Sequence, residues 1–219
     1  MTRAKTRVKQ QQEQNKHPTI MVSSCVYGIE ELLEQIFAIL SGAGFTVWMS
    51  YKGTVPVNPG LSNFDNCLAA VEACNFFLGI LTTRYGSGRD KTIINEKSIT
   101  HRELLRVLEL KKPRWFLAHN DLIFARRLLG DLGYDNNVKR KKLKLIHSRA
   151  IDDLRVIDMY DAVIQVEKRL KLRVGNWPQP FVTKEDANIF VVAQFLRFGD
   201  AVKFVEQIGH RSLERGGVR

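Results

Sequence analysis

The sequence predicts an α/β fold in which a parallel sheet of about five strands lies between two layers of helices. Short apolar runs alternate with amphipathic helix patterns, as expected for strands joined by helical crossovers. The clearest unit has an apolar run at Phe76–Leu81, a glycine-bearing loop, a helix pattern, the stop Pro113 and a second run at Trp115–Ala118. Because such crossovers are parallel and right-handed, the loops that follow the strands collect at one edge of the sheet, where ligands usually bind.

Two strands and two helices are predicted before this unit, at Thr19–Ser24, residues 28–40, Phe45–Met49 and residues 63–74. The first helix pattern carries its acidic residues early, where the helix dipole favours them. The second places Cys67 and Cys74, seven residues apart, on one face. We interpret both cysteines as small core residues.

The chain becomes more basic and helical after His119. Helix patterns are predicted at 121–133, 151–172 and 184–208, and Trp177–Phe181 is an edge strand because its two prolines exclude a central one. In the first of these helices Phe124, Leu128, Leu129 and Leu132 form the apolar pattern, with Arg126 and Arg127 outward. We therefore divide the chain into a disordered basic arm (1–17), an α/β core (18–119), a basic helical insertion (120–175) and a last strand and helix that complete the core (176–219).

Composition narrows the classes of function. The chain has 219 residues, of which 44% are hydrophobic, and its 34 Lys and Arg against 23 Asp and Glu give a net charge of +11. This excess favours an anionic ligand or, through the basic insertion, nucleic acid. Three cysteines without a C-x-x-C motif fit a reducing compartment. No apolar run approaches the roughly 18 residues that span a bilayer, and the amino terminus lacks a signal-peptide pattern, so we expect a cytoplasmic protein without a membrane partner.

Several common sites are missing from the sequence. The five histidines have no metal-ligand spacing, and neither a P-loop nor a G-x-G-x-x-G motif occurs. We therefore expect no metal and no bound cofactor, and treat a nucleotide as a substrate or ligand.

Four stretches together resemble a bacterial TIR-like family of unknown function. They are V-S-S-C-V-Y-G-I-E-E-L-L, F-T-V-W-M-S, L-A-A-V-E-A-C-N-F-F-L-G-I-L-T-T-R-Y-G-S-G and S-I-T-H-R-E-L-L-R-V-L-E-L-K-K-P-R-W-F-L-A-H, and they cover about residues 18 to 120. This family is similar to TIR domains and nucleoside 2-deoxyribosyltransferases. The resemblance implies a flavodoxin-like sheet in the order 2-1-3-4-5. It also implies cleavage of an N-glycosidic bond by a glutamate on the helix after the third strand, and Glu103 matches that position.

Residue chemistry gives Glu103 two alternative roles. Cleavage of a ribosyl C–N bond passes through an oxocarbenium-like centre, which a carboxylate stabilises or attacks. The spacing Thr100-His-Arg-Glu103 is also a capping box, in which Thr100 and Glu103 would bond each other's backbone amides. The sequence leaves both roles open.

The remaining candidate residues follow strand ends. Ser23, Ser24 and Tyr27 lie at the end of the first strand and in its loop, Trp48 ends the second strand, and Arg84, Tyr85 and Gly86 follow the third. Thr100, at the start of the next helix, is also a candidate substrate contact. The serines would bind ribose or phosphate, Trp48 would wall the pocket, Arg84 would hold a phosphate, Tyr85 would stack on a base, and Gly86 would let backbone amides approach an anion. Each also has a plain structural alternative, as turn, loop or core residue.

Three functions therefore remain open. The first is a nucleotide N-glycosidase or ribosyl transferase, acting on NAD or a related nucleotide and, by resemblance, serving antiphage defence. The second is a non-catalytic module that senses a nucleotide or forms homo-oligomers. The third is a nucleic-acid-binding protein.

Overall fold

The computed structural model describes residues 17–88, 96–146 and 149–196, and its strands and helices alternate as predicted. The strands are β1 (Thr19–Ser24), β2 (Thr46–Trp48), β3 (Phe76–Leu81), β4 (Arg114–His119) and β5 (Pro178–Phe181). The helices are α2 (Glu30–Gly42), α3 (Asn63–Ala73), α4 (Ile99–Glu109), α5 (Asn120–Asp131), α6 (Asn137–Arg140), α7 (Arg155–Val163) and α8 (Lys184–Phe195), with 3-10 turns at Ser50–Lys52 and Leu170–Leu172. The predicted arm up to residue 16 and the predicted helix beyond Leu196 lie outside the described residues.

The five strands form one parallel sheet in the order β2-β1-β3-β4-β5. The predicted flavodoxin-like topology is therefore confirmed. The strand order reverses between β1 and β3, which places the switch point of the sheet at the carboxyl ends of these two strands. β5 lies at the edge of the sheet beside β4, where its prolines are tolerated.

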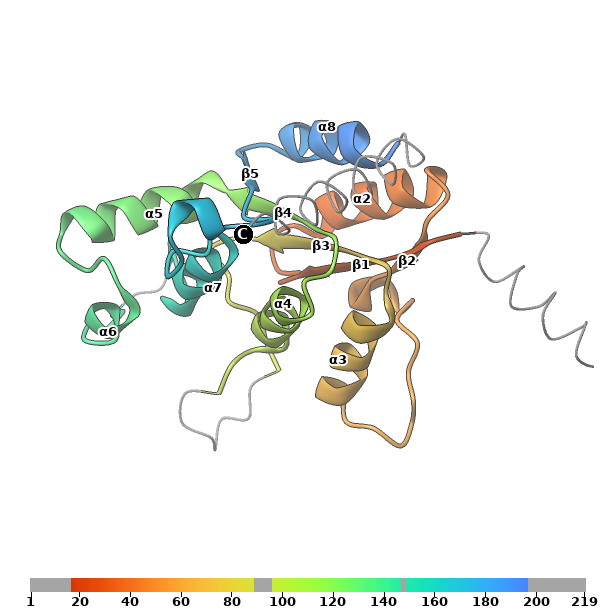
Figure 1. Ribbon diagram of the computed structural model, residues 1–219, viewed down its shortest axis with the longest axis horizontal. Coiled ribbons are helices and arrows are strands. Elements are labelled where there is room, and N and C mark those ends of the chain that lie inside the picture. Colours follow the sequence, from red (N-terminus) through yellow and green to blue (C-terminus); the bar gives the residue numbers. More distant parts are fainter. Residues whose placement is uncertain (1–16, 89–95, 147–148, 197–219) are drawn as a thin grey trace, which may run out of the picture.

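Helices cover both faces of the sheet (Figure 1). α2 and α8 pack on one face, whereas α3, α4 and α7 pack on the other. Because side chains alternate along a strand, Ile20 and Val22 of β1 face α2 and α8, while Met21 joins the opposite cluster. Ser23, two residues after Met21, lies on the same face of the strand as Met21. Its hydroxyl is therefore directed to the face that carries α4.

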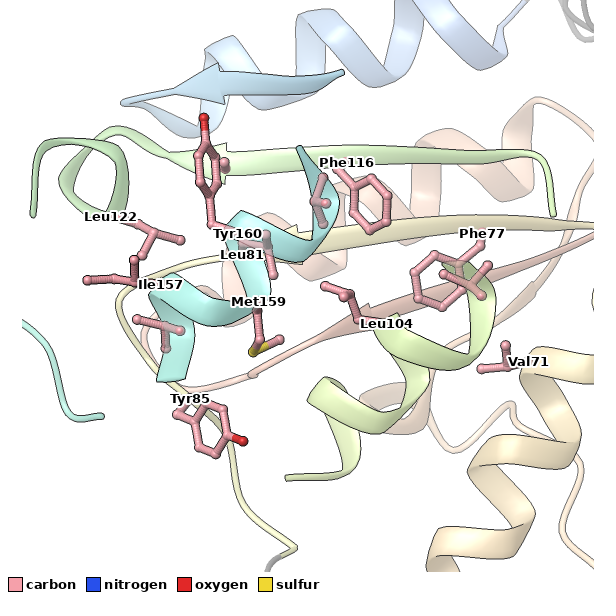
Figure 2. Packing of buried hydrophobic residues seen from close by; sticks show 14 of the residues in the cluster. Val71, Phe77, Leu81, Tyr85, Leu104, Phe116, Leu122, Ile157, Met159 and Tyr160 are labelled. Atoms are coloured by element: carbon pink, nitrogen blue, oxygen red, sulfur yellow. The ribbon is translucent and has the colours of Figure 1, made fainter. Parts of the chain in front are cut away.

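Part of the predicted insertion belongs to the core of this domain. α7 packs Ile157, Met159 and Tyr160 into the same apolar cluster as Leu81 and Leu122 (Figure 2). The predicted helix at 151–172 was too long, because α7 covers only Arg155–Val163. The chain turns at Gln165, whose φ of 54° is left-handed and cannot continue a right-handed helix.

The orientation of α5 also differs from the prediction. Leu122 and Ile123 are buried, whereas Phe124, Leu128 and Leu132, which carried the predicted apolar pattern, are exposed by 63%, 45% and 62%. Arg126 is not outward as predicted, since its Nε donates to Asp161 of α7 at 2.5 Å. The buried residues Leu122 and Ile123 therefore define the face of α5 that meets the core.

Candidate functional site

The carboxyl group of Glu103 lies beneath the switch point of the sheet. Glu103 is the fifth residue of α4 and is only 4% exposed. Ser23, at the end of β1, donates its hydroxyl to Glu103 Oε2 at 2.5 Å, and the thiol of Cys67 from α3 also forms a hydrogen bond with this carboxyl. Three elements that are distant in sequence thus meet at one carboxyl group.

Burial decides the protonation of this cluster. Loss of solvent raises the pKa of Glu103 above its ordinary value of 4.5, while the hydrogen bonds from Ser23 and Cys67 act in the opposite direction. None of the described cationic side chains contributes to the shift. Burial, together with the neighbouring Glu103, raises the pKa of Cys67 to about 12, so its thiol stays protonated and can donate. Burial outweighs the two hydrogen bonds, so the pKa of Glu103 lies above its ordinary value.

The capping role considered for Glu103 is wrong. The N-cap of α4 is Ser98, whose hydroxyl accepts a hydrogen bond from the amide of His101. Thr100 is already the second residue inside the helix, so it cannot form the cap. Glu103 is turned away from its own helix start and toward β1. This orientation leaves its carboxyl available for a role other than capping.

The loops after β1 and β3 meet the start of α4. The guanidinium of Arg84 lies 5.6 Å from the ring centre of Tyr27, which is 71% exposed. Gly86 has a φ of 88°, and a Cβ there would lie 3.3 Å from Thr100 Oγ1 and 3.8 Å from Cys25 Cβ. Any larger residue would be strained at this φ and would crowd Thr100. The structure therefore brings Tyr27, Arg84, Gly86 and Thr100 to the same end of the sheet as Ser23 and Glu103.

Ser24 and Trp48 make contacts that fit their structural alternatives. Ser24 donates its hydroxyl to the carbonyl of Cys25, as expected for a residue that starts a turn. Strand alternation directs its side chain away from the face that Ser23 occupies. Trp48 is half-buried and packs against the apolar cluster beneath α3 and α4. These contacts are those of a core aromatic residue, which was the structural alternative for Trp48.

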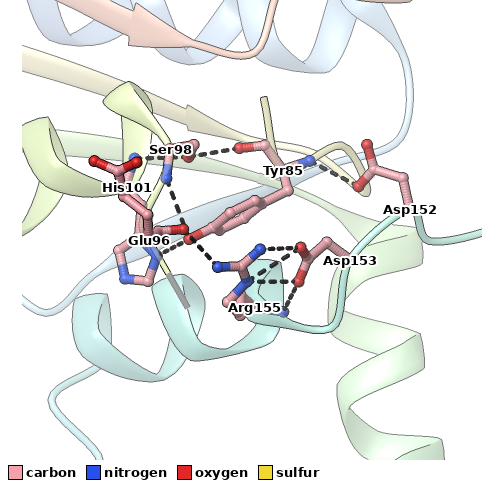
Figure 3. A network of polar contacts seen from close by, with 7 residues as sticks. All are labelled: Tyr85, Glu96, Ser98, His101, Asp152, Asp153 and Arg155. Carbon is pink, nitrogen blue, oxygen red and sulfur yellow. Dashed lines mark hydrogen bonds and ion pairs between the residues drawn. The ribbon is translucent and has the colours of Figure 1, made fainter. Parts of the chain in front are cut away.

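Tyr85 does not lie where it could stack on a base. Its side chain is fully buried and holds together the network of Figure 3. The hydroxyl lies 2.7 Å from His101 Nδ1, the carbonyl accepts from Ser98 Oγ at 2.8 Å, the amide donates to Asp152 at 2.8 Å, and Arg155 covers the ring at 4.4 Å. These contacts fasten the loop after β3 to the starts of α4 and α7. Tyr85 therefore positions the helix that carries Glu103.

His101 belongs to this supporting network. Burial, together with the nearby charges of Lys97 and Arg155, lowers its pKa to about 4. The ring is therefore neutral at physiological pH and is committed to Tyr85 through Nδ1. Its position two residues from Glu103 had indicated that it points elsewhere, and the structure agrees.

Cys67 is the neighbour of Glu103 that sequence reasoning missed. Its helical spacing to Cys74 suggested two equivalent core residues, and Cys74 is indeed buried. Cys67 is half-buried and bonds to Glu103 instead. The spacing between α3 and α4 in the sequence gives no indication that these two residues meet.

Two hollows lie outside this cluster. One, of about 490 Å³, is bounded by the start of α2, His119 and the start of α8. The other, of about 860 Å³, lies between the end of α4, α6, α7 and the segment that follows α7. Glu103 lines neither of them. Among the described residues no group of three or more His, Cys, Asp or Glu side chains is arranged to hold a metal ion, and none of the helices could cross a membrane.

Comparison with known proteins gives a family without an assigned activity. The family model described as a domain of unknown function, DUF4062, matches residues 19–174. No curated protein matches the sequence significantly. The matched region runs from β1 through the segment after α7, and so includes Ser23, Cys67 and Glu103. The chain therefore belongs to the DUF4062 family of domains of unknown function.

Proposed function

We propose that this domain is a TIR-like nucleotide N-glycosidase or ribosyl transferase, acting in the cytoplasm on NAD or a related nucleotide in bacterial antiphage defence. One observation carries the proposal. Glu103 is a buried carboxyl without a cationic partner among the described residues, and it is bonded to Ser23 at the switch point of a flavodoxin-like sheet. Carboxyl groups with raised pKa values in such positions are typical of catalytic sites. The resemblance of the sequence to TIR-like proteins supplies the reaction class.

The reaction would use Glu103 in its ionised form. As the C–N bond breaks, its electron pair leaves with the base, and the carboxylate stabilises or attacks the electron-poor anomeric carbon. Ser23 would hold the carboxylate in one rotamer, and its hydrogen bond favours the charged form. Arg84 lies in the loop after β3 and offers a cation for a phosphate of the substrate.

Access to Glu103 requires a local movement. The carboxyl is only 4% exposed and lines neither of the two hollows. Gly86 lies directly against Thr100 and Cys25, so the two loops and the start of α4 close over the site. Substrate binding would separate these segments, and closure around the substrate would exclude bulk water. One water, or the acceptor nucleophile in a transferase, would still have to reach the anomeric carbon to take up the ribosyl group and release Glu103 as a free carboxylate.

The test is a hydrolysis screen with purified protein. Wild type and Glu103→Gln are incubated with NAD, NADP, nucleosides and deoxynucleosides, and release of the free base is followed by chromatography. We expect base release by wild type and a loss of at least about 100-fold in Glu103→Gln, because the amide cannot carry the negative charge. Glu109→Gln, on the same helix but exposed, is the matched control and should retain wild-type activity. Equal activity of wild type and Glu103→Gln would remove Glu103 from the mechanism.

A second function is favoured by the burial of Glu103. A domain with a closed switch point can bind a nucleotide at its outer loops without chemistry at the carboxyl, as a sensing module would. Calorimetric titration of NAD and related nucleotides into wild type and Arg84→Ala separates the two functions. Binding that depends on Arg84, without base release on prolonged incubation, would support sensing over catalysis.

A further inference from the structure

The outer face of α5 carries a continuous apolar stripe. Phe124 and Leu128 of α5 and Leu132, the C-cap residue of this helix, follow one another at intervals of four residues and are 63%, 45% and 62% exposed. Residues at this spacing lie along one side of a helix. Single exposed apolar residues are ordinary, but three large ones in a row mark a surface that contacts another molecule.

This stripe cannot turn into the core of its own domain. Leu122 and Ile123 on the opposite face of α5 are buried, and Arg126 is paired with Asp161 of α7 at 2.5 Å. His119 caps the helix by accepting the amide of Asp121. These contacts fix the rotation of α5 about its axis. The outward direction of the stripe is therefore a stable property of the fold.

Two opposite charges flank the stripe on one side. Arg127 and Asp131 are exposed, stand one helical turn apart and lie on the same side of Phe124 and Leu128. When a two-fold axis relates two antiparallel helices, the same side of each helix faces the partner, and the two chains run in opposite directions. The earlier residue on one helix then faces the later residue on the other. The pair Arg127 and Asp131 is self-complementary in that arrangement.

We propose that α5 associates with α5 of a second copy of this chain, antiparallel about a two-fold axis near Leu128. Phe124 then packs beside Leu132 of the partner subunit, and Arg127 meets Asp131 of the partner subunit, with both contacts repeated by symmetry. One helix pair buries less area than the roughly 1,200 Å² of stable complexes. The dimer is therefore weak and forms as the concentration rises.

Sedimentation velocity over a range of protein concentrations tests this association. We expect the weight-average mass of wild type to rise from monomer toward dimer, and Leu128→Glu to remain monomeric, because it places a carboxylate against its own symmetry mate. Ile189→Glu is the matched control. It introduces the same charge at an apolar residue of α8 that is 68% exposed, and it should dimerise as wild type does. Wild type that is monomeric at every concentration, or Leu128→Glu that dimerises normally, overturns the proposal.

Charge exchange tests the orientation of the two helices. Arg127→Asp alone places like charges opposite each other and should weaken dimerisation at least several-fold, as should Asp131→Arg alone. The double variant Arg127→Asp/Asp131→Arg restores opposite charges across the two-fold axis and should return the dissociation constant to near the wild-type value. Failure of the double variant to recover, with circular dichroism showing an intact fold, contradicts the antiparallel arrangement. An association that survives all three substitutions uses another surface.

Discussion

Two buried groups of carboxyls on the same side of the sheet are stabilised in opposite ways. Asp158 and Asp161 of α7 both accept from Arg140 Nη2, at 2.7 and 2.6 Å, and Asp161 also binds Arg126. Among the described residues, Glu103 of α4 has a hydroxyl and a thiol as its side-chain partners. The first group is paired with cationic side chains. The second is held by neutral donors, and its pKa is raised.

This difference separates a structural cluster from a candidate for chemistry. Ion pairs in the interior keep their charges fixed, so the Arg140 cluster is suited to joining α5, α6 and α7. A buried carboxyl that has no cationic partner among the described residues and has a raised pKa is not fixed in an ion pair, and such carboxyls are typical of sites for proton transfer or nucleophilic attack. Stability should therefore depend strongly on the first cluster, and activity on the second.

Arg140→Ala should give the largest loss of stability. Arg140 is 4% exposed, and its removal leaves the carboxylates of Asp158 and Asp161 without their shared cation. Loss of one partner of a buried ion pair costs about 3 to 5 kcal/mol, and Arg126 reduces that cost at Asp161. Urea denaturation followed by fluorescence measures the change. Lys139→Ala, which removes an exposed cation next to it in sequence, should leave the midpoint unchanged; similar losses in both variants would contradict a structural role for the cluster.

Tyr85→Phe should cost less, about 1 to 2 kcal/mol, because it removes one hydroxyl from a buried network. That hydroxyl lies 2.7 Å from His101 Nδ1, which would lose this partner in a buried position. Since the network fixes the start of α4, the variant should also reduce activity without touching the reacting group. Thermal unfolding gives the stability, and base release gives the activity. If the variant loses the expected stability but keeps wild-type activity, the network supports the fold but does not position Glu103.

The fold could be predicted because apolar periodicity and turn residues are local signals. Phe76–Leu81 and Thr19–Ser24 match the observed strands residue for residue, and glycine and proline mark most of the ends. The errors fell where tertiary contacts override such signals. The pattern at Phe124, Leu128 and Leu132 has the period of a core face, but Leu122 and Ile123 occupy the core instead. The chain turns at Gln165, just after α7, although no glycine or proline marks this helix end in the sequence.

The site was only partly visible in the sequence. Strand order and resemblance placed Ser23, Gly86 and Glu103 at one edge, and the structure brings them together there. Burial could not be read from the sequence. It turns Tyr85 from a predicted ligand contact into a core residue, and it makes Cys67 a partner of Glu103. These assignments depend on distances between elements that no local pattern encodes.

Ser23→Ala tests whether the hydrogen bond from Ser23 influences the pKa of Glu103. It removes the hydroxyl that donates to Glu103 at 2.5 Å, and a lost buried hydrogen bond to such a group costs about 1 kcal/mol. Because this bond lowers the pKa of Glu103, its loss should raise that pKa further. If Glu103 acts as a carboxylate, the rising limb of the activity against pH should move to higher pH in the variant. Ser24→Ala is the control, since its hydroxyl bonds only to the carbonyl of Cys25 among the described residues. If the rising limb of the pH profile does not move in Ser23→Ala, the serine does not influence the pKa of the carboxyl.

Glu103→Gln should have the smallest effect on stability at low pH, and the effect should change as the pH rises. The pKa of Glu103 is raised in the folded protein above the ordinary value of 4.5 that applies when the chain is unfolded. Below pH 4.5 the carboxyl is neutral in both states, so the amide and the acid are nearly equivalent, within about 1 kcal/mol. As the pH rises from 4.5 through the raised pKa, the unfolded chain releases its proton first, and wild type loses stability that the amide retains. Urea denaturation of both proteins at pH 4, 6 and 8 should show the difference moving steadily in favour of the glutamine variant. A difference that is constant with pH, or that grows in favour of wild type, would mean that Glu103 is held as a charged group, in which case its cluster would resemble that of Arg140 after all.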